Sequence, residues 1–303
     1  MSKVKSILII GGSGFVGTNL ALRLRDAHKV FMTYNTHRIA IPGVTCIPLQ
    51  LDAREFLKRV AFNIQPDIVI FTAGGLNVEW SEQNKRQAET VHVAGTANVV
   101  NVFDILQPKL IYLSSCYSFD GAKGNYHESD VALPSTALGR AKLGGENFVR
   151  SKSLNYVVVR SSPLLGRSNP LNPSFLDLLR IMLDRGKTVE LSHYEYHSFS
   201  SIYGLTELFE TIVESGIKNK VLHYSGLTKL TYYELGILFA ERFGYDKKLI
   251  LPKKDRSREG TSSENKIEDY SLNSTHISQT LKFKPLLVEE CFDLIEQKLI
   301  TAF

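Results

Sequence analysis

Short runs of apolar residues alternate with longer stretches of mixed polarity along the first half of the chain. Runs such as Ile68–Phe71 are apolar at every position, which is typical of strands buried on both faces of a parallel sheet. The strands predicted in this way are Ser6–Ile10, Lys29–Tyr34, Val44–Leu49, Asp67–Thr72, Lys109–Ser114 and Tyr156–Arg160. The segments between them predict helices at Phe15–Ala27, Ala53–Asn63, Ser81–Leu106 and Ser135–Ser151. This alternation predicts an α/β fold with a Rossmann-type doubly wound parallel sheet.

The pattern changes after Arg160, where prolines crowd residues 162–174 and predict a crossover loop. Further helices are predicted at Phe175–Arg185, Gly204–Ser215, Tyr232–Phe243 and Leu287–Leu299, with short strands near Val189 and at Val221–Tyr224. The polar stretch Pro252–Asp269 is interpreted as a mobile loop. We therefore predict a first domain over residues 1–161 and a smaller C-terminal α+β lobe over residues 162–303. The boundary is approximate, because the chain can cross between the two parts more than once.

The composition excludes several classes to which this protein could belong. Of its 303 residues, 43% are hydrophobic and 22% are charged, which is typical of a folded protein and not of a disordered one. It has no run of about 18 apolar residues, so no membrane helix is expected, and its start does not resemble a secretion signal. The net charge of +5 comes from scattered basic residues, which argues against nucleic-acid binding. Three cysteines without a CxxC pair favour neither a disulfide framework nor a metal site, and a cytoplasmic location is predicted.

A glycine-rich turn directly follows the first predicted strand and opens the first predicted helix. Gly11, Gly14 and Gly17 have the spacing of a phosphate-binding turn: one makes the tight turn, one lets a pyrophosphate approach, and one allows close packing. The helix that follows offers free N–H groups to phosphates. Because the glycines stand in this strand–turn–helix context, we expect the first domain to bind a dinucleotide.

The end of the second strand bears on which dinucleotide is bound. An acidic residue there would bind the ribose 2′-hydroxyl of NAD, but this chain has Asn35 and then Arg38, and no carboxylate. Arg38 can form a bidentate contact with a 2′-phosphate, or it can be a solvated loop arginine. We predict NADP in preference to NAD. Asp52 is expected either near the adenine or as a helix N-cap. The residues expected to contact the cofactor are Gly11, Ser13, Gly14, Phe15, Val16, Gly17, Asn35, Arg38, Asp52, Ala53, Thr72, Ala73, Gly74 and Lys142.

The glycine spacing resembles that of extended short-chain dehydrogenases/reductases, and residues 113–134 narrow the resemblance. The run Leu113–Gly121, the segment Gly124–Glu128 and Pro134 are similar to the dTDP-4-dehydrorhamnose reductase family. That family also includes the regulatory β subunit of methionine adenosyltransferase, which binds NADP. The resemblance implies reduction of a nucleotide-sugar carbonyl by a tyrosine and a lysine one helical turn apart, assisted by a serine or threonine.

The catalytic pattern implied by the resemblance is incomplete in this chain. Ser115 takes the hydroxyl position and Lys142 the lysine position, but the tyrosine position is Leu138. A leucine cannot donate a proton, and a positioned acid typically contributes about 10²–10⁴ in rate. The alternative proton donors are His92, which replaces the family's asparagine, Tyr117 and Tyr126. Each of these three side chains could instead be a buried packing residue with no catalytic role.

The substrate side is less defined, and it is predicted to involve Cys116, Tyr117, Trp80 and Ser162. Three functions stay open. The first, favoured narrowly, is an NAD(P)-dependent reductase or epimerase-like enzyme that acts on a nucleotide-sugar. The second is a catalytically quiet, NADP-binding regulatory or scaffold subunit of another enzyme, and the third is a reductase of a small carbonyl compound. Members of the family often pair through two long helices, so the chain is compatible with a homodimer.

Overall fold

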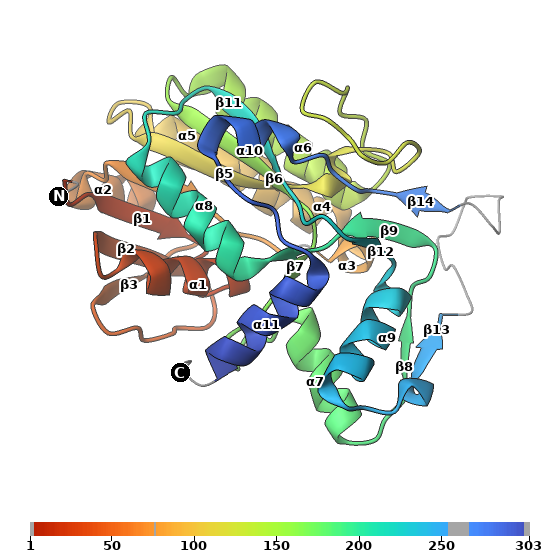
Figure 1. Cartoon of the computed structure of the whole chain (residues 1–303). Coiled ribbons are helices and arrows are strands. Elements are labelled where there is room, and N and C mark those ends of the chain that lie inside the picture. The colour runs from red at the N-terminus through yellow and green to blue at the C-terminus, as the bar shows by residue number, and fades with distance from the viewer. Residues whose placement is uncertain (1–2, 76, 254–266, 300–303) are drawn as a thin grey trace.

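The computed structural model describes residues 3–75, 77–253 and 267–299, and its centre is a seven-stranded, entirely parallel sheet (Figure 1). The strand order is β11-β6-β5-β4-β1-β2-β3. The strands are β1 (Ser6–Ile10), β2 (Lys29–Tyr34), β3 (Val44–Pro48), β4 (Ile68–Phe71), β5 (Lys109–Ser115), β6 (Tyr156–Ser161) and β11 (Lys220–Tyr224). From β1 the chain first adds β2 and β3 on one side and then β4, β5 and β6 on the other, as in a doubly wound fold. The predicted α/β Rossmann-type class is therefore confirmed.

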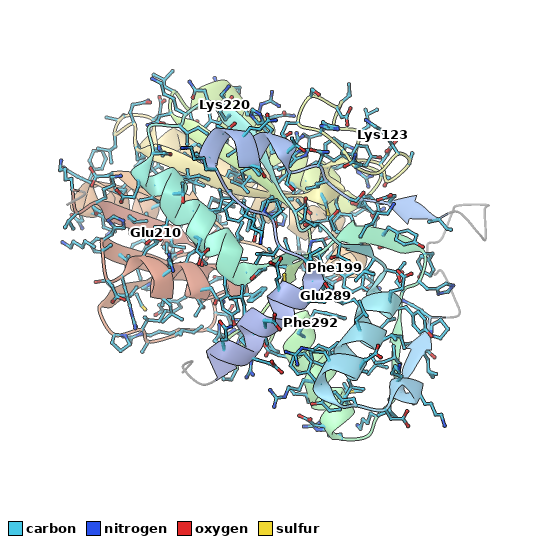
Figure 2. The ribbon with its side chains drawn as sticks, in the orientation of Figure 1. Lys123, Phe199, Glu210, Lys220, Glu289 and Phe292 are labelled. Carbon is cyan, nitrogen blue, oxygen red and sulfur yellow. The ribbon has the colours of Figure 1, made fainter. Side chains whose placement is uncertain are left out.

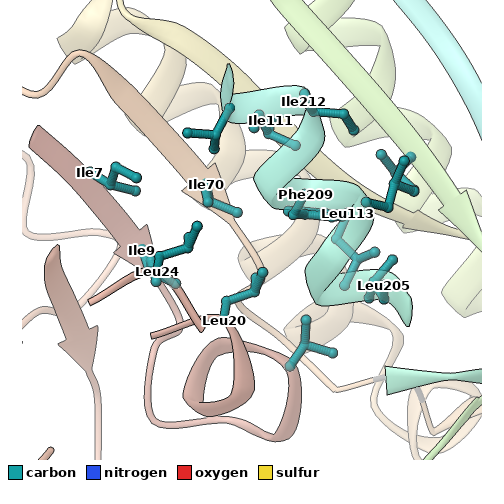
Figure 3. Close-up of a cluster of buried hydrophobic side chains, with 14 of the residues drawn as sticks. Ile7, Ile9, Leu20, Leu24, Ile70, Ile111, Leu113, Leu205, Phe209 and Ile212 are labelled. Carbon is teal, nitrogen blue, oxygen red and sulfur yellow. The ribbon is translucent and has the colours of Figure 1, made fainter. Parts of the chain in front are cut away.

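Successive strand residues point to opposite faces of the sheet, and each face is covered by helices. Ile7 and Ile9 pack with α1 (Phe15–Leu24), α8 (Ile202–Glu214) and α10 (Thr275–Leu281) in one core (Figure 3). Leu8 and Ile10 pack on the other side with α2 (Arg54–Ile64), α5 (Thr96–Phe103) and α6 (Ala137–Lys152). The result is a three-layer α/β/α domain whose two cores consist of buried aliphatic and aromatic side chains.

The sheet draws on both predicted parts of the chain. β11 comes from beyond residue 161 and pairs with β6 in parallel, from Lys220 opposite Val157 to Tyr224 opposite Ser161. α8 packs beside α1, and Arg23 of α1 forms an ion pair of 2.7 Å with Glu210 of α8 (Figure 2). The chain thus crosses the approximate boundary at residue 161, and the division into 1–161 and 162–303 stays a prediction.

A smaller lobe lies beside the carboxyl end of the sheet (Figure 1). Its helices are α7 (Phe175–Asp184), α9 (Tyr232–Phe243) and α11 (Val288–Leu299). Its short strands are β7 (Leu164–Leu165), β8 (Val189–Leu191), β9 (Glu195–Ser198), β10 (Ser200–Ser201), β12 (Lys229–Leu230), β13 (Ile250–Pro252) and β14 (Glu268–Asp269). Phe199 and Phe292, labelled in Figure 2, belong to its own buried core. Most of the predicted loop Pro252–Asp269 lies outside the described residues.

The prediction of one continuous helix over Ser81–Leu106 is wrong. The segment consists of α3 (Val78–Gln83), α4 (Lys85–Glu89), a π-helix η1 (Thr90–Gly95) and α5. Asn84 interrupts it with φ −126° and ψ 47°, outside the helical region. The π-helix widens the chain where the ring of His92 packs against Gly74, and a Cβ on that glycine would lie 2.2 Å from the ring. Tertiary packing therefore overrides the helical pattern at this point.

Candidate functional site

A groove with a volume of about 420 Å³ runs along the carboxyl ends of the central strands. Doubly wound folds bind their ligands at this edge of the sheet. Ten of the fourteen predicted cofactor residues line it: Gly11, Ser13, Gly14, Phe15, Val16, Asn35, Thr72, Ala73, Gly74 and Lys142. The groove also includes Thr36, His37, Gly75, Leu113 and Asn172, which the sequence did not single out.

The glycine-rich turn is held rigidly against β2 and β4. Gly11 has a φ of +85°, and a Cβ there would lie 2.6 Å from the backbone of Ala73, so only glycine fits. Its N–H donates to Oγ1 of Thr33 at 3.1 Å. A Cβ on Gly17 would lie 2.3 Å from the carbonyl oxygen of Gly11, which explains the last glycine as a packing residue. The turn therefore presents the unpaired N–H groups at the start of α1 to the groove.

Four residues that are predicted to contact the cofactor are not among those that line the groove: Gly17, Arg38, Asp52 and Ala53. The N-cap of α2 is Ala53, without a side-chain hydrogen bond, so the alternative of Asp52 as N-cap is wrong. Arg38 is exposed, and its positive charge partly offsets the burial that raises the pKa of Cys46 on β3. Contacts of these four residues with a bound dinucleotide stay predictions.

Lys142 stands at the inner end of the groove. It is carried by α6, its side chain is buried, and its Nζ donates to the carbonyl oxygen of Leu113 at 3.0 Å. Burial lowers the pKa of Lys142 to about 7, and the nearby carboxylate of Glu146 only partly offsets this effect. The ammonium is therefore close to half ionised near neutrality, and a ligand oxygen within reach would favour its charged form.

This low pKa predicts a stability that rises with pH. Because the pKa of an unfolded lysine is about 10.4, the unfolded state binds the proton more tightly between pH 7 and that value. We expect the free energy of unfolding to rise by about 2 kcal/mol from pH 7 to pH 9 through this group. Urea titrations of the wild type and of Lys142→Met measure the effect. The variant should lose that part of the increase, and equal slopes in the two proteins would contradict the assignment.

The predicted catalytic and substrate residues at the end of β5 lie outside the lining of the groove. Ser115, Cys116, Tyr117 and Leu138 are all buried, and none of them lines the groove. Oγ of Ser115 accepts the N–H of Tyr117 at 3.3 Å, while the phenol of Tyr117 lies 3.4 Å from Nε2 of His197. Burial raises the pKa of Cys116 to about 12. Leu138 packs with Tyr117 and Cys116 in an apolar cluster where the family pattern has its phenol.

The other proposed proton donors are also held in place by the protein. Burial and the charge of Lys142 lower the pKa of His92 to about 2, so this imidazole is neutral at physiological pH. Tyr126 is buried, stacks on Phe119 with ring centroids 4.2 Å apart, and donates its hydroxyl proton to Asp120. Burial and that bond both raise the pKa of Tyr126. Neither side chain lines the groove.

Two predicted substrate residues lie elsewhere. The hydroxyl of Ser162 is buried and donates to the carbonyl oxygen of Ser198, which joins β6 to the smaller lobe. Trp80 is 43% exposed on α3 and does not line the groove. A substrate contact for either residue stays a prediction.

The smaller lobe closes one side of the groove through asparagine side chains. Nδ2 of Asn172 donates to the carbonyl oxygen of Ser13 at 2.9 Å, and Nδ2 of Asn169 donates to Oγ1 of Thr18 at 3.1 Å. Both asparagines lie in the proline-rich loop before α7. No sequence signal joins this loop to a turn more than 150 residues earlier. His37, in contrast, lies one position before the predicted Arg38 and could have been considered with it.

Comparison with known proteins agrees with this geometry. The RmlD substrate binding domain family matches residues 5–289, which is nearly the whole chain. The chain belongs to the RmlD family. Methionine adenosyltransferase 2 subunit beta from Pongo abelii is 24% identical over 262 residues, covering 82% of this chain and 75% of that protein. A dTDP-4-dehydrorhamnose reductase from Aggregatibacter actinomycetemcomitans is 23% identical over 236 residues, covering 76% of each chain.

A solved structure shows the same fold as this RmlD family member. The dTDP-4-dehydrorhamnose reductase from Bacillus anthracis, in complex with NADP, superimposes with a TM-score of 0.82 at 18% identity, covering 99% of this chain and 100% of that one. The expected resemblance is thus confirmed. Among the described residues, no helix is long and apolar enough to cross a membrane.

The groove of this RmlD family member fits a nicotinamide dinucleotide. Gly11 and Gly17 leave no room for a Cβ, the N–H groups at the start of α1 have no helical partner, and the volume lies within the range of cofactor sites. The glycine turn would hold the pyrophosphate, and Lys142 the ribose next to the nicotinamide. A bound dinucleotide of this type supplies hydride-transfer chemistry.

Proposed function

We propose that this chain binds a nicotinamide dinucleotide, with NADP preferred, and does not carry out the carbonyl reduction typical of its family. The observation that carries the proposal is Leu138, which is wholly buried one helical turn before Lys142. A proton donor at that position must reach the carbonyl oxygen of a substrate. Here the position holds a leucine that packs with Tyr117 and Cys116 in a buried cluster and has no proton to donate.

A protein of this kind acts through what it binds. The buried Leu138 in place of a proton donor and the intact glycine turn support a regulatory or scaffold subunit that responds to the dinucleotide. Methionine adenosyltransferase 2 subunit beta, which is similar over most of its length, is named as a subunit of another enzyme. We propose the same kind of role here, in the cytoplasm, with a partner enzyme that the chain's own residues do not identify. A homodimer is also compatible with the exposed parts of α4 and α6.

The second candidate is the nucleotide-sugar reductase or epimerase-like activity. One observation favours it: Leu113 lines the groove, and Ser115 follows only two residues later at the end of β5. A movement that opens the end of β5 to the groove would be needed to bring the buried serine hydroxyl to a substrate. Reduction of a small carbonyl compound needs the same movement. In either case another group would have to supply the proton.

Titration calorimetry and a turnover assay test the proposal together. We expect saturable binding of NADP⁺ or NAD⁺ to the wild type, and no oxidation of NADPH with a panel of 4-keto sugar nucleotides and simple carbonyls. Leu138→Tyr should also be inactive, because a phenol would enter a packed cluster at a cost of about 1–3 kcal/mol rather than face a substrate. Turnover by the wild type would overturn the proposal that the chain does not carry out carbonyl reduction. Turnover by Leu138→Tyr but not the wild type would show that only the acid is missing.

A further inference from the structure

The peptide that joins Ser13 to Gly14 in the glycine turn is held from the smaller lobe. The carbonyl oxygen of Ser13 accepts two side-chain amides, from Nδ2 of Asn172 at 2.9 Å and from Nδ2 of Asn169 at 3.3 Å. On the other side of the same peptide, the N–H of Gly14 donates to the carbonyl oxygen of Gly11 at 3.1 Å. Because both polar groups of the peptide have partners, its plane is fixed.

The orientation of this peptide matters to an anion in the groove. Ser13 and Asn172 line the groove together with the residues at the start of α1, whose N–H groups have no helical partner. A carbonyl oxygen carries a partial negative charge that would oppose a phosphate, and the two amide groups offset this charge. The asparagines therefore favour the form of the turn that presents N–H groups to a phosphate.

Further contacts join the first turns of α1 to the same loop of the smaller lobe. Nδ2 of Asn19 donates to the carbonyl oxygen of Arg167 at 3.1 Å, and Nδ2 of Asn169 donates to Oγ1 of Thr18 at 3.1 Å. Asn19 does not line the groove. Its contact with the loop can therefore be removed without touching a ligand there.

Residues 166–174, the segment that makes these contacts, are built onto the first turn of α7. Oδ2 of Asp177 accepts the N–H groups of Ser168 at 2.9 Å and of Ser174 at 3.0 Å, and its Oδ1 pairs with Nε of Arg167 at 2.8 Å. The hydroxyl of Ser174 donates to the carbonyl oxygen of Gly166 at 2.6 Å. One face of α7 lies in the core of the smaller lobe. Segment 166–174 thus connects the glycine turn to that lobe.

We infer that segment 166–174 positions the glycine turn for the pyrophosphate through Asn169 and Asn172, and that a bound dinucleotide in return stabilises this segment and α7. The inference rests on the proposed binding of a nicotinamide dinucleotide, and it identifies how that binding reaches the smaller lobe. Coupling between two parts of a protein is reciprocal, so contacts that raise the affinity for a ligand are stabilised by that ligand to the same extent. Both asparagines are positioning residues, because they act through the Ser13 peptide.

Calorimetry of the full chain with NADP⁺ and with NAD⁺ measures the first half of the inference. Asn172→Ala should lower both affinities by about threefold to tenfold, the value of one or two hydrogen bonds, and leave their ratio unchanged because both ligands contain the pyrophosphate. Asn172→Asp has the same shape but no donor, so it should bind at least as weakly. Asn19→Ala should lower both affinities by about threefold.

Asn273→Ala is the matched control for these variants. It removes a side-chain amide that also joins two distant segments, since Nδ2 of Asn273 donates to Oδ1 of Asn125 at 3.2 Å. Neither residue lines the groove. This variant should bind both dinucleotides as the wild type does.

Amide hydrogen exchange with and without saturating NADP⁺ measures the second half. In the wild type, we expect the ligand to slow exchange in residues 166–184 by about threefold to tenfold, in addition to protecting the glycine turn. In Asn172→Ala, the protection of residues 166–184 should be lost while the glycine turn is still protected. A residue that only holds the fold together would change exchange equally with and without the ligand.

Each contrary result has a separate meaning. Wild-type affinity in Asn172→Ala and Asn19→Ala, or equal exchange of residues 166–184 with and without NADP⁺, overturns the inference and leaves the proposed function intact. A loss confined to Asn172→Ala, with no change in Asn19→Ala or in exchange, makes Asn172 a ligand contact and overturns its positioning role. If the wild type binds neither dinucleotide at millimolar concentration, the proposed function itself fails, so the two failures are distinguishable.

Discussion

Replacing Glu146 by glutamine is expected to lower the free energy of unfolding by about 3–5 kcal/mol. The carboxylate accepts two bonds from Nε of Arg160, at 3.0 and 3.2 Å, and one from Nη2 at 2.8 Å. It also accepts the hydroxyls of Ser114 and Ser118. Both charged side chains are almost completely buried, at 0% and 3% exposure. An amide would leave the guanidinium without a counter-charge in the interior.

Urea unfolding of Glu146→Gln measures this cost, and two further variants define its origin. Glu146→Leu combined with Arg160→Met removes both charges, and Ser114 and Ser118 can still bond to each other, their hydroxyls being 3.4 Å apart. That double variant should be clearly more stable than Glu146→Gln. Glu296→Gln breaks an exposed pair with Arg242 and should change stability by less than about 1 kcal/mol. A loss below 1 kcal/mol in Glu146→Gln would contradict the buried-charge argument.

The same ion pair explains how the inner end of the groove is positioned. Glu146 follows Lys142 by one helical turn on α6, and its partners come from β5, β6 and the short turn that contains Ser118. The pair therefore fixes α6 against the strand that supplies Leu113. Lys142 owes its place in the groove to this contact as well as to its own bond to the Leu113 carbonyl.

The sheet was readable from the sequence because its signal is local. Several of the predicted strands, such as Ile68–Phe71, are continuous apolar runs, and all six predictions agree with the observed bounds to within about one residue. The break at Asn84 and the π-helix were not predicted, because the apolar spacing of residues 81–106 also suits one regular helix. The π-helix brings the ring of His92 against Gly74, a contact between two segments that the spacing within residues 81–106 does not contain.

In the candidate site, too, the parts that depend on local sequence were predicted and those that depend on tertiary packing were not. The glycine turn was predicted because one short segment contains all of its parts. Asn172 could not be found, since it reaches Ser13 only through the packing of the smaller lobe. Ser115 stands at the end of β5, but the packing of Tyr117 with Leu138 beside it depends on side-chain directions that no sequence pattern specifies, and its catalytic role stays a prediction.

Gly14→Asp is expected to weaken binding of either dinucleotide by at least about 100-fold without weakening the fold. Gly14 has an extended backbone, with φ −77° and ψ 173°, which any residue adopts. A Cβ there meets only the carbonyl oxygen of Gly11, at 3.4 Å, and otherwise points into open space. Gly17 is unsuitable for this test, because its Cβ would lie 2.3 Å from the same oxygen. The new carboxylate thus enters the groove rather than the core.

The substitution should act in opposite directions on stability and on binding. Gly14 is the N-cap of α1, and aspartate is a preferred N-cap that also interacts favourably with the helix dipole, so the melting temperature should be equal or higher. The same carboxylate accepts the N–H groups that a pyrophosphate needs, and its charge repels the phosphates. Gly14→Asn has nearly the same shape and no charge, so it should lose clearly less affinity. Thermal unfolding and calorimetry of the two variants test both effects, and full affinity in Gly14→Asp would place the pyrophosphate away from the start of α1.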